Sequence, residues 1–333
     1  MQFISRLDRF LGAYLVWFTL GAVALGVIFD GIFSVLLPIT PALFAFMTFA
    51  NTLGSSFRKM GEAFSRPLPI LTTLVLLHAV IPLLCLGICR LLFADAPLFI
   101  IGLVLEFAIP TGVVSLMWVS IGRGNLPLCL SIVLLDTLLS PLVVPLTLRV
   151  LVGSIVQMDT VSMMLDLLYM VGIPALLALL CYRVREGRTA QTLKQNLAPF
   201  AKLSLLTVTL SNATSAAPFL KNLDGTLALV IAVLLFMNLF GYFLGYVVSL
   251  YILKTDFPSC QSITLTSGLR NISAGAVLAA QYFPSDVMFP VAFSPVFTQL
   301  TLATVTKVLR KTRAGQADQA AYEAALASQP PNI

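Results

Sequence analysis

Long apolar segments separated by short polar breaks dominate this chain and decide what it can fold into. Each segment is long enough to cross hydrocarbon about 30 Å thick. Of the 333 residues, 59% are hydrophobic and 10% are charged, whereas soluble domains carry about 25% charge. The sequence therefore predicts an all-α, multi-pass membrane protein with ten transmembrane helices. The ten segments are 11–29, 34–54, 67–91, 97–121, 126–152, 160–182, 200–218, 225–252, 259–283 and 287–309.

The distribution of Lys and Arg predicts how the chain is oriented. Sixteen of the 20 basic residues fall on one side of the predicted spans, and the positive-inside rule places that side in the cytoplasm. Both termini fall on it, so we expect cytoplasmic termini and, as the simplest setting, a bacterial-type inner (plasma) membrane. These residues are Arg6, Arg9, Arg58, Lys59, Arg66, Arg123, Arg183, Arg185, Arg188, Lys194, Lys202, Lys254, Lys307, Arg310, Lys311 and Arg313.

A hydrophilic stretch near the middle, YRVREGRTAQTLKQNLAPF, divides the chain into two halves of five segments. A unit with an odd number of spans comes out inverted when it is copied in tandem, which is a recurring plan in secondary transporters. We assign the first inverted repeat, with its cytoplasmic N-terminal segment, to 1–182. We assign the second repeat to 160–309, so that it begins with the sixth segment, which the two ranges share. Residues 310–333 form a small, polar cytoplasmic tail that we expect to be disordered or a frayed helix.

Several function classes are disfavoured by the sequence. The chain has one histidine and no paired catalytic set, so we do not expect an enzyme. It has no GxxxxGK[ST] loop, which argues against ATP-driven transport. The positive-inside bias accounts for the net charge of +6 without a nucleic-acid partner. The five cysteines show no metal-ligand spacing, so no metal or cofactor is expected. The expected partners are the lipid bilayer and a small molecule.

Two segments carry helix-breaking residues at corresponding places in the two halves. Segment four reads LEFAIPTGVVSLMWVSIGRGN, and Pro110 with Gly112 predicts a break over 109–113. Segment nine reads SITLTSGLRNISAG, with Ser267-Gly268 at its centre. Such discontinuous helices form binding sites near the bilayer midplane in transporters. The alternative, simple kinks between packed helices, is less favoured because both breaks coincide with polar clusters.

Arg270 lies within segment nine, where an arginine near the midplane costs about 2.5–3.5 kcal/mol even on lenient insertion scales. Three roles are open. The guanidinium could be a tethered cation that holds the crossing together, a bidentate anchor for an anionic substrate, or one half of a structural ion pair. Glu106 and Asp136 are the intramembrane acids available to offset its charge.

Polar residues near the two breaks are the candidates for substrate contact. Segment seven adds the polar stretch TLSNATSAAP, for which tight packing of small residues is an equal alternative. The candidate substrate-binding residues are Thr111, Ser115, Asn212, Ser267, Arg270 and Asn271.

In these regions the sequence resembles the bile acid:sodium symporter family of ten-helix secondary transporters. The strongest match is PTGVVSLMWVSIGRGNLPLCLSIVLLDTLLSPLVVP, with an Arg-Gly-Asn turn at 123–125 and a Leu-Ser-Pro exit at 139–141. SGLRNISAGAVLAAQYF is similar to the family's Gly-x-Gln-Asn break. The resemblance implies a core domain in which segments four and nine cross, and a panel domain of segments one, two, six and seven. It also implies transport of organic anions by alternating access, usually driven by sodium.

The sequence departs from that family where sodium would bind. The family's acidic ligand aligns with Thr266 and its Gln with Arg270, and the Ser-Asn pair of segment four becomes Ser115-Leu116. Sodium needs several hard oxygen ligands, which leucine, valine and a thiol do not supply. We therefore predict weak or absent sodium dependence. Two further ion-site positions fall at Cys129 and Val133 in segment five. The polar ion-site position of segment three falls at His78 or one residue from it.

Three titratable residues, His78, Glu106 and Asp136, are candidates for coupling to protons instead. The alternatives to an organic-anion symporter with degenerate sodium sites therefore stay open. One is a proton-coupled or facilitative carrier of another substrate class. The other is a sensor that has kept the binding fold and lost transport.

Overall fold

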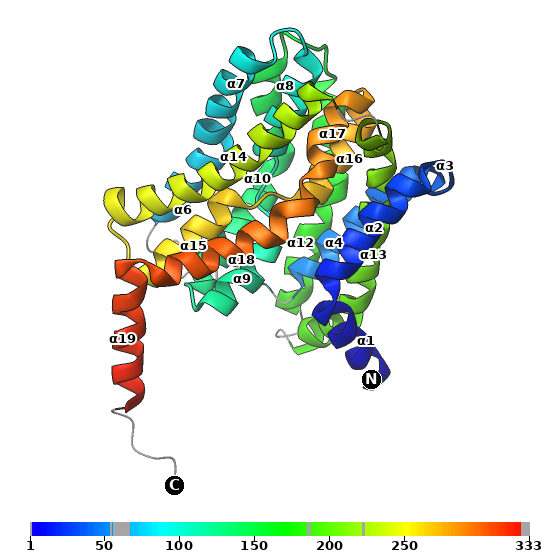
Figure 1. Ribbon diagram of the computed structural model, residues 1–333. Coiled ribbons are helices and arrows are strands. Elements are labelled where there is room, and N and C mark those ends of the chain that lie inside the picture. Colours follow the sequence, from blue (N-terminus) through cyan, green and yellow to red (C-terminus); the bar gives the residue numbers. More distant parts are fainter. Residues whose placement is uncertain (1, 54, 56–66, 185–187, 222–223, 328–333) are drawn as a thin grey trace.

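Every regular element in the described part of the chain is a helix (Figure 1), as the apolar sequence predicts. The computed structural model describes residues 2–53, 55, 67–184, 188–221 and 224–327. Four of the basic residues used to predict the orientation lie outside these ranges: Arg58, Lys59, Arg66 and Arg185.

The helices follow one another with short connections. Segments three, six and eight each contain one π-helical turn (η2, η3 and η4), and segment two begins with a 3₁₀ turn (η1). In chain order the elements are α1 (Gln2–Ala13), α2 (Leu15–Ile28), α3 (Asp30–Phe33), η1 (Ser34–Ile39), α4 (Thr40–Thr52), α6 (Pro67–Val75), η2 (Leu76–Val80), α7 (Ile81–Leu92), α8 (Pro97–Ala108), α9 (Val114–Gly122), α10 (Leu126–Val152), α11 (Thr160–Leu167), η3 (Leu168–Gly172), α12 (Ile173–Val184), α13 (Arg188–Lys221), α14 (Gly225–Val247), η4 (Val248–Ile252), α15 (Phe257–Gly268), α16 (Ile272–Tyr282), α17 (Ser285–Phe293), α18 (Pro295–Lys311) and α19 (Arg313–Ala327).

Fewer than ten of the predicted segments are single apolar helices that could span a membrane. Within the described residues five pass that test, and two bent pairs would raise the number to seven. Segments four and nine fail because each is broken, and α13 is not among the five because polar residues occur both in its first turns and in the stretch TLSNATSAAP. Ten spans therefore remain a prediction. The five are Asp30–Thr52, Pro67–Leu92, Leu126–Val152, Thr160–Tyr182 and Gly225–Ile252.

The first segment is not one straight helix over 11–29. Leu11 belongs to α1, and the chain bends at Tyr14 so that the axes of Ile4–Ala13 and Trp17–Ile28 differ by 75°. The reason lies in the side chains: α1 alternates apolar residues with Arg6 and Arg9, so one of its faces favours water, whereas α2 is apolar all round.

The tail, expected to be disordered or a frayed helix, is helical in its described part. Residues Arg313–Ala327 form helix α19, and the residues after Ala327 lie outside the described part. The sequence RAGQADQAAYEAALA is rich in alanine, which has the highest helix propensity.

Aspartate and asparagine side chains mark where many helices begin. Asn125, Asp159, Asp224, Asp256 and Asn271 each accept a hydrogen bond from a backbone N–H in the first turn of α10, α11, α14, α15 and α16. At Asp159, which is outside the apolar segments, the hydrogen bonds from the following turn also lower the pKa of the carboxyl. These caps satisfy backbone N–H groups that the first turn of a helix would otherwise leave unpaired, and Asn271 does so at the second break.

The helices pack in two groups. In one, α13 packs along α2 and α4, and α12 packs against α4. In the other, α8 packs against α7 and α17, and α15 packs against α14 and α10. Figure 1 shows α2, α4, α12 and α13 gathered on one side of the molecule. The two broken segments belong to the second group.

The contact between α2 and α13 depends on a glycine. A Cβ at Gly26 would overlap the backbone carbonyl oxygen of Leu210 and lie 2.8 Å from the Cβ of Ala213. Gly21, on the same helix, has open space around it. Small residues of this kind let membrane helices approach closely.

We predict opposite effects of alanine at these two glycines. Gly26→Ala should lower the free energy of unfolding by about 1–3 kcal/mol because it forces α2 away from α13. Gly21→Ala should leave stability unchanged or raise it by up to about 1 kcal/mol, because alanine favours the helix. Thermal melting of the purified variants in detergent measures both. Equal melting temperatures for the two would contradict this packing.

Candidate functional site

Both predicted helix breaks exist, and one is displaced. In segment four, α8 ends at Ala108 and α9 begins at Val114, which places the break over 109–113. In segment nine, α15 continues through Ser267-Gly268 and the break follows over 269–271. The reason is that Gly268 provides close packing rather than a break, since a Cβ there would overlap the Tyr242 ring.

The two breaks cross and bond to each other. The Asn271 backbone N–H donates to the Pro110 carbonyl at 2.8 Å, and Thr111 Oγ1 donates to the Thr266 carbonyl at 2.9 Å. A Cβ on Gly112 would lie 3.1 Å from the Arg270 carbonyl oxygen, so the backbones are nearly in contact. The crossing thus satisfies polar backbone groups that broken helices would otherwise leave unpaired in the membrane.

Arg270 is buried at this crossing without a direct partner. Its side chain is 3% exposed, and among the described residues none of its three guanidinium nitrogen atoms has a hydrogen-bond acceptor. Its Cζ lies 6.0 Å from the centre of the Phe107 ring, and the charges of Asp136 and Glu106 act on it at longer range. No ion pair within 4 Å involves it in that part of the chain, which disfavours the purely structural role.

The two buried acids have different surroundings. Asp136 is fully buried, pairs through Oδ1 with His78 Nε2, and accepts the Thr111 backbone N–H through Oδ2 at 2.6 Å. Glu106 is 1% exposed, and its Oε2 has no partner among the described residues. Asp136 is therefore occupied by groups other than Arg270.

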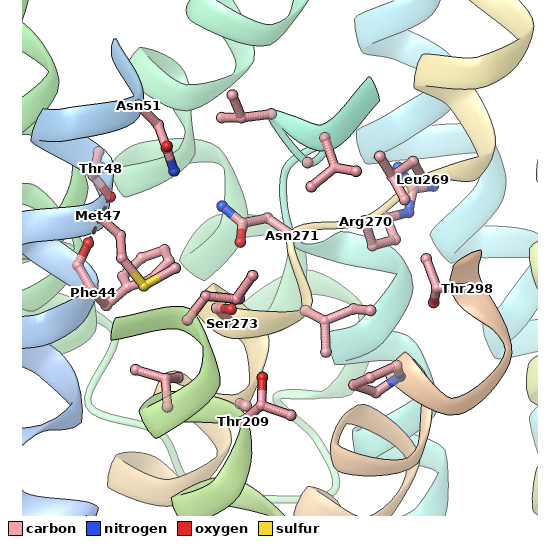
Figure 2. A pocket seen from close by; sticks show the side chains of 18 of the residues that line it. Phe44, Met47, Thr48, Asn51, Thr209, Leu269, Arg270, Asn271, Ser273 and Thr298 are labelled. Atoms are coloured by element: carbon pink, nitrogen blue, oxygen red, sulfur yellow. Dashed lines mark hydrogen bonds between the residues drawn. The ribbon is translucent and has the colours of Figure 1, made fainter. Parts of the chain in front are cut away.

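A cavity of about 160 Å³ lies beside the crossing, and its wall is mostly apolar. Figure 2 shows Asn271 extending into it toward Asn51 of α4, whereas Arg270 extends to the opposite side of the connection, toward the core helices. Arg270 is the one charged residue among the described residues that line the cavity. Its polar lining consists of Thr19, Thr48, Asn51, Thr52, Thr137, Thr209, Asn212, Arg270, Asn271, Ser273 and Thr298.

The predicted substrate residues divide between this cavity and the crossing. Asn212, Arg270 and Asn271 line the cavity. Among the described residues Thr111, Ser115 and Ser267 do not line it. Ser115 Oγ donates to the Gly112 carbonyl at 2.8 Å, and Thr111 links the breaks. The Ser115 and Thr111 hydroxyls are thus engaged with backbone carbonyls, whereas Ser267 Oγ is buried with no partner among the described residues.

The positions aligned with sodium ligands present few free oxygen atoms. Thr266 Oγ1 donates to the Ser262 carbonyl of its own helix at 2.8 Å. Cys129 and Val133 are buried in an apolar cluster, against which Leu116 packs. His78 is engaged with Asp136. Leu, Val and a thiol at these places do not form a hard-ligand cage.

Sequence reasoning missed the cavity wall contributed by α2 and α4, whereas on α13 it identified Asn212. Thr48, Asn51 and Thr52 lie three and four residues apart on one face of the otherwise apolar α4. This spacing is the signal that could have found them. Thr209 opens the polar stretch TLSNATSAAP, three residues before Asn212, whereas Thr19 is an isolated hydroxyl whose pattern carries no such signal.

Broken helices that cross beside a midplane cavity are typical of secondary transporters. Residues 40–223 match the Sodium Bile acid symporter family. The chain belongs to this family and is an integral, multi-pass membrane protein, a secondary transporter of a small molecule.

Three relatives illustrate the similarity. The uncharacterized protein YbaS of Bacillus subtilis is 40% identical over 271 residues, which cover 81% of this chain and 88% of YbaS. The uncharacterized sodium-dependent transporter YocS of the same organism is 24% identical over 320 residues, or 95% of this chain and 98% of YocS. The probable sodium/metabolite cotransporter BASS3 of Oryza sativa is 26% identical over 246 residues, 73% of this chain and 57% of BASS3.

The hydrogen bond from Thr111 to Thr266 gives a prediction about the crossing. Thr111→Val keeps the side-chain shape but leaves the buried Thr266 carbonyl unpaired, so stability should fall by about 1–3 kcal/mol. The control is Thr304→Val, since Thr304 is exposed and donates to Leu300 in its own helix. Thermal melting in detergent should show a loss for the first variant and almost none for the second. The reverse order would contradict the crossing.

Proposed function

We propose that this protein is an alternating-access carrier of a small organic anion in the plasma membrane. The observation that carries the proposal is the buried, unpaired Arg270 beside a cavity whose described lining is otherwise uncharged. In a low-dielectric interior a cation of this kind attracts an anion and repels a cation over several ångströms. An anionic substrate would also offset part of the cost of burying the guanidinium.

In this proposal Arg270 is a fixed cation that takes the place of bound sodium. Its side chain extends away from the cavity centre, so its effect on the substrate is mainly one of charge (Figure 2). Direct polar contacts would come from Asn271 and Asn51, which project toward each other across the cavity. A few placed polar groups in an apolar wall are the usual way for a pocket to orient a ligand.

The cavity size restricts the substrate class. Its volume of about 160 Å³ is close to that of an engineered cavity of about 150 Å³ that holds benzene. We infer a single-ring or branched-chain carboxylate or sulfonate. A steroid-sized anion would not fit this conformation.

Packing supports a core and a panel that move relative to each other. The core would hold the broken segments, and the panel would be α2, α4, α13 and segment six (α11, η3 and α12). Of these, α2, α4, η3 and α13 contribute the opposite cavity wall. The ten segments would form two inverted five-helix repeats. Helices α1 and α19 lie toward the same end of the molecule in Figure 1, in keeping with termini that are both cytoplasmic.

The relatives YocS and BASS3 carry names that refer to sodium. For this chain we propose weak or absent sodium dependence, because leucine, valine and cysteine occupy aligned ligand positions. Arg270 would supply the positive charge permanently.

Anion binding to purified protein tests this proposal. Benzoate should raise the melting temperature of the wild type equally in sodium-free and sodium-containing buffer, and the neutral isostere benzamide should not. A unit charge about 8 Å from the anion, at an effective dielectric constant of about 20, contributes about 2 kcal/mol. Arg270→Gln should therefore weaken binding roughly thirtyfold.

Arg270→Lys is the matched variant that separates the two functional roles of the arginine. It keeps the charge and loses the bidentate fork. A fixed cation predicts that this variant retains most of the affinity, whereas a direct anchor predicts that it loses affinity as Arg270→Gln does. Benzoate binding that requires sodium and survives Arg270→Gln would overturn the proposal.

A further inference from the structure

We propose that the His78–Asp136 pair carries one transported proton, so that the protein is a proton–anion symporter. This inference rests on the proposed function and names its coupling ion. The pair joins the π-helical turn η2 to α10, in the centre of the group of helices that holds the crossing.

The geometry of the pair leaves one place for a proton. Asp136 is fully buried; its Oδ1 is paired with His78 Nε2, and its Oδ2 accepts the Thr111 backbone N–H. The His78 side chain is 8% exposed, and its Nδ1 is buried with no partner in the described residues. With Nε2–H donating to Asp136, the Nδ1 lone pair can accept a proton, and the pair then changes from one negative charge to none.

Two hydrogen bonds to one peptide group connect this pair to the cavity. The Thr111 backbone N–H donates to Asp136, and the carbonyl of the preceding residue, Pro110, accepts from the Asn271 N–H. Asn271 lines the cavity. Protonation at His78 weakens the negative field of Asp136 at the first of these hydrogen bonds.

Charge balance makes the proton and the anion bind together. Asp136 of the pair acts by its charge on Arg270 at the crossing, and so do Glu106 on α8, Tyr242 on α14 and Cys85 on α7, so these groups form one buried set of interacting charges. One added proton raises the net charge of this buried set by one, and one monoanion in the cavity restores it. Each therefore favours the binding of the other, and the linkage is reciprocal.

Flux into proteoliposomes tests the inference, with benzenesulfonate as probe. This anion stays charged at all accessible pH values, so it does not carry protons through the lipid. With the outside one pH unit more acidic, sodium absent and the membrane potential clamped, wild type should accumulate it about tenfold. An enclosed pH dye should report acidification of the lumen with about one proton per anion.

His78→Gln is the decisive variant, because the glutamine amide can still donate a hydrogen bond to Asp136 but cannot take up a proton. Two rates are compared: uptake driven by the pH gradient, and exchange of labelled for unlabelled anion. In His78→Gln the ratio of the first rate to the second should fall about tenfold, to its value without a pH gradient. Glu106→Gln, the matched change at the other buried acid, should keep that ratio. If His78→Gln keeps the ratio, or Glu106→Gln alone loses it, the inference is wrong.

Proton uptake on binding provides a second measurement that needs no variant. Titration calorimetry of wild type with benzenesulfonate in two buffers of different ionisation enthalpy should show about one proton taken up per anion bound. Zero protons would overturn the inference.

The two proposals fail in different ways. Anion exchange without proton movement would remove only the coupling to protons and leave the proposed function intact, whereas no anion binding and no exchange would remove the proposed function itself.

Discussion

A guanidinium buried without a direct partner among the residues that the structure describes is the feature on which the rest of this structure depends. Such a charge is costly to bury, and an acid in contact usually offsets the cost. Here the Phe107 ring lies 6.0 Å from the guanidinium carbon, and Asp136 is already paired with His78. The compensation comes instead from charges at longer range and, in our account, from the transported anion. The same unpaired charge would thus explain why the site selects anions.

The crossing holds this charge in place. Two interrupted helices would leave backbone groups unpaired in lipid, and each interruption is satisfied largely by the other. Asn271 bonds to Pro110, and Thr111 bonds to Thr266. Because Thr111 also donates to Asp136, the backbone of one break is attached to the acid of a neighbouring helix. A change of charge at that acid therefore acts on the element that lines the cavity.

The sequence predicted those features that local chemistry decides. Pro110 and Gly112 located the first break, because proline cannot donate and glycine tolerates the turn. The second break was misplaced, since Gly268 is required by the Tyr242 ring, a contact between distant segments. The His78–Asp136 pair and the wall from α4 were not predictable as contacts, because they depend on how helices pack across 58 residues of chain or more. Both residues of the pair were nevertheless identified as titratable intramembrane groups.

The most direct test of the central claim is a structure of the wild-type protein with bromobenzoate, determined in sodium-free buffer with the anomalous signal of bromine. Our account predicts the ring in the cavity beside Asn271 and Asn51, with the carboxylate turned toward Arg270 and no bound metal ion. Bromine absent from the cavity at saturating ligand, or a carboxylate turned away from Arg270, would contradict it.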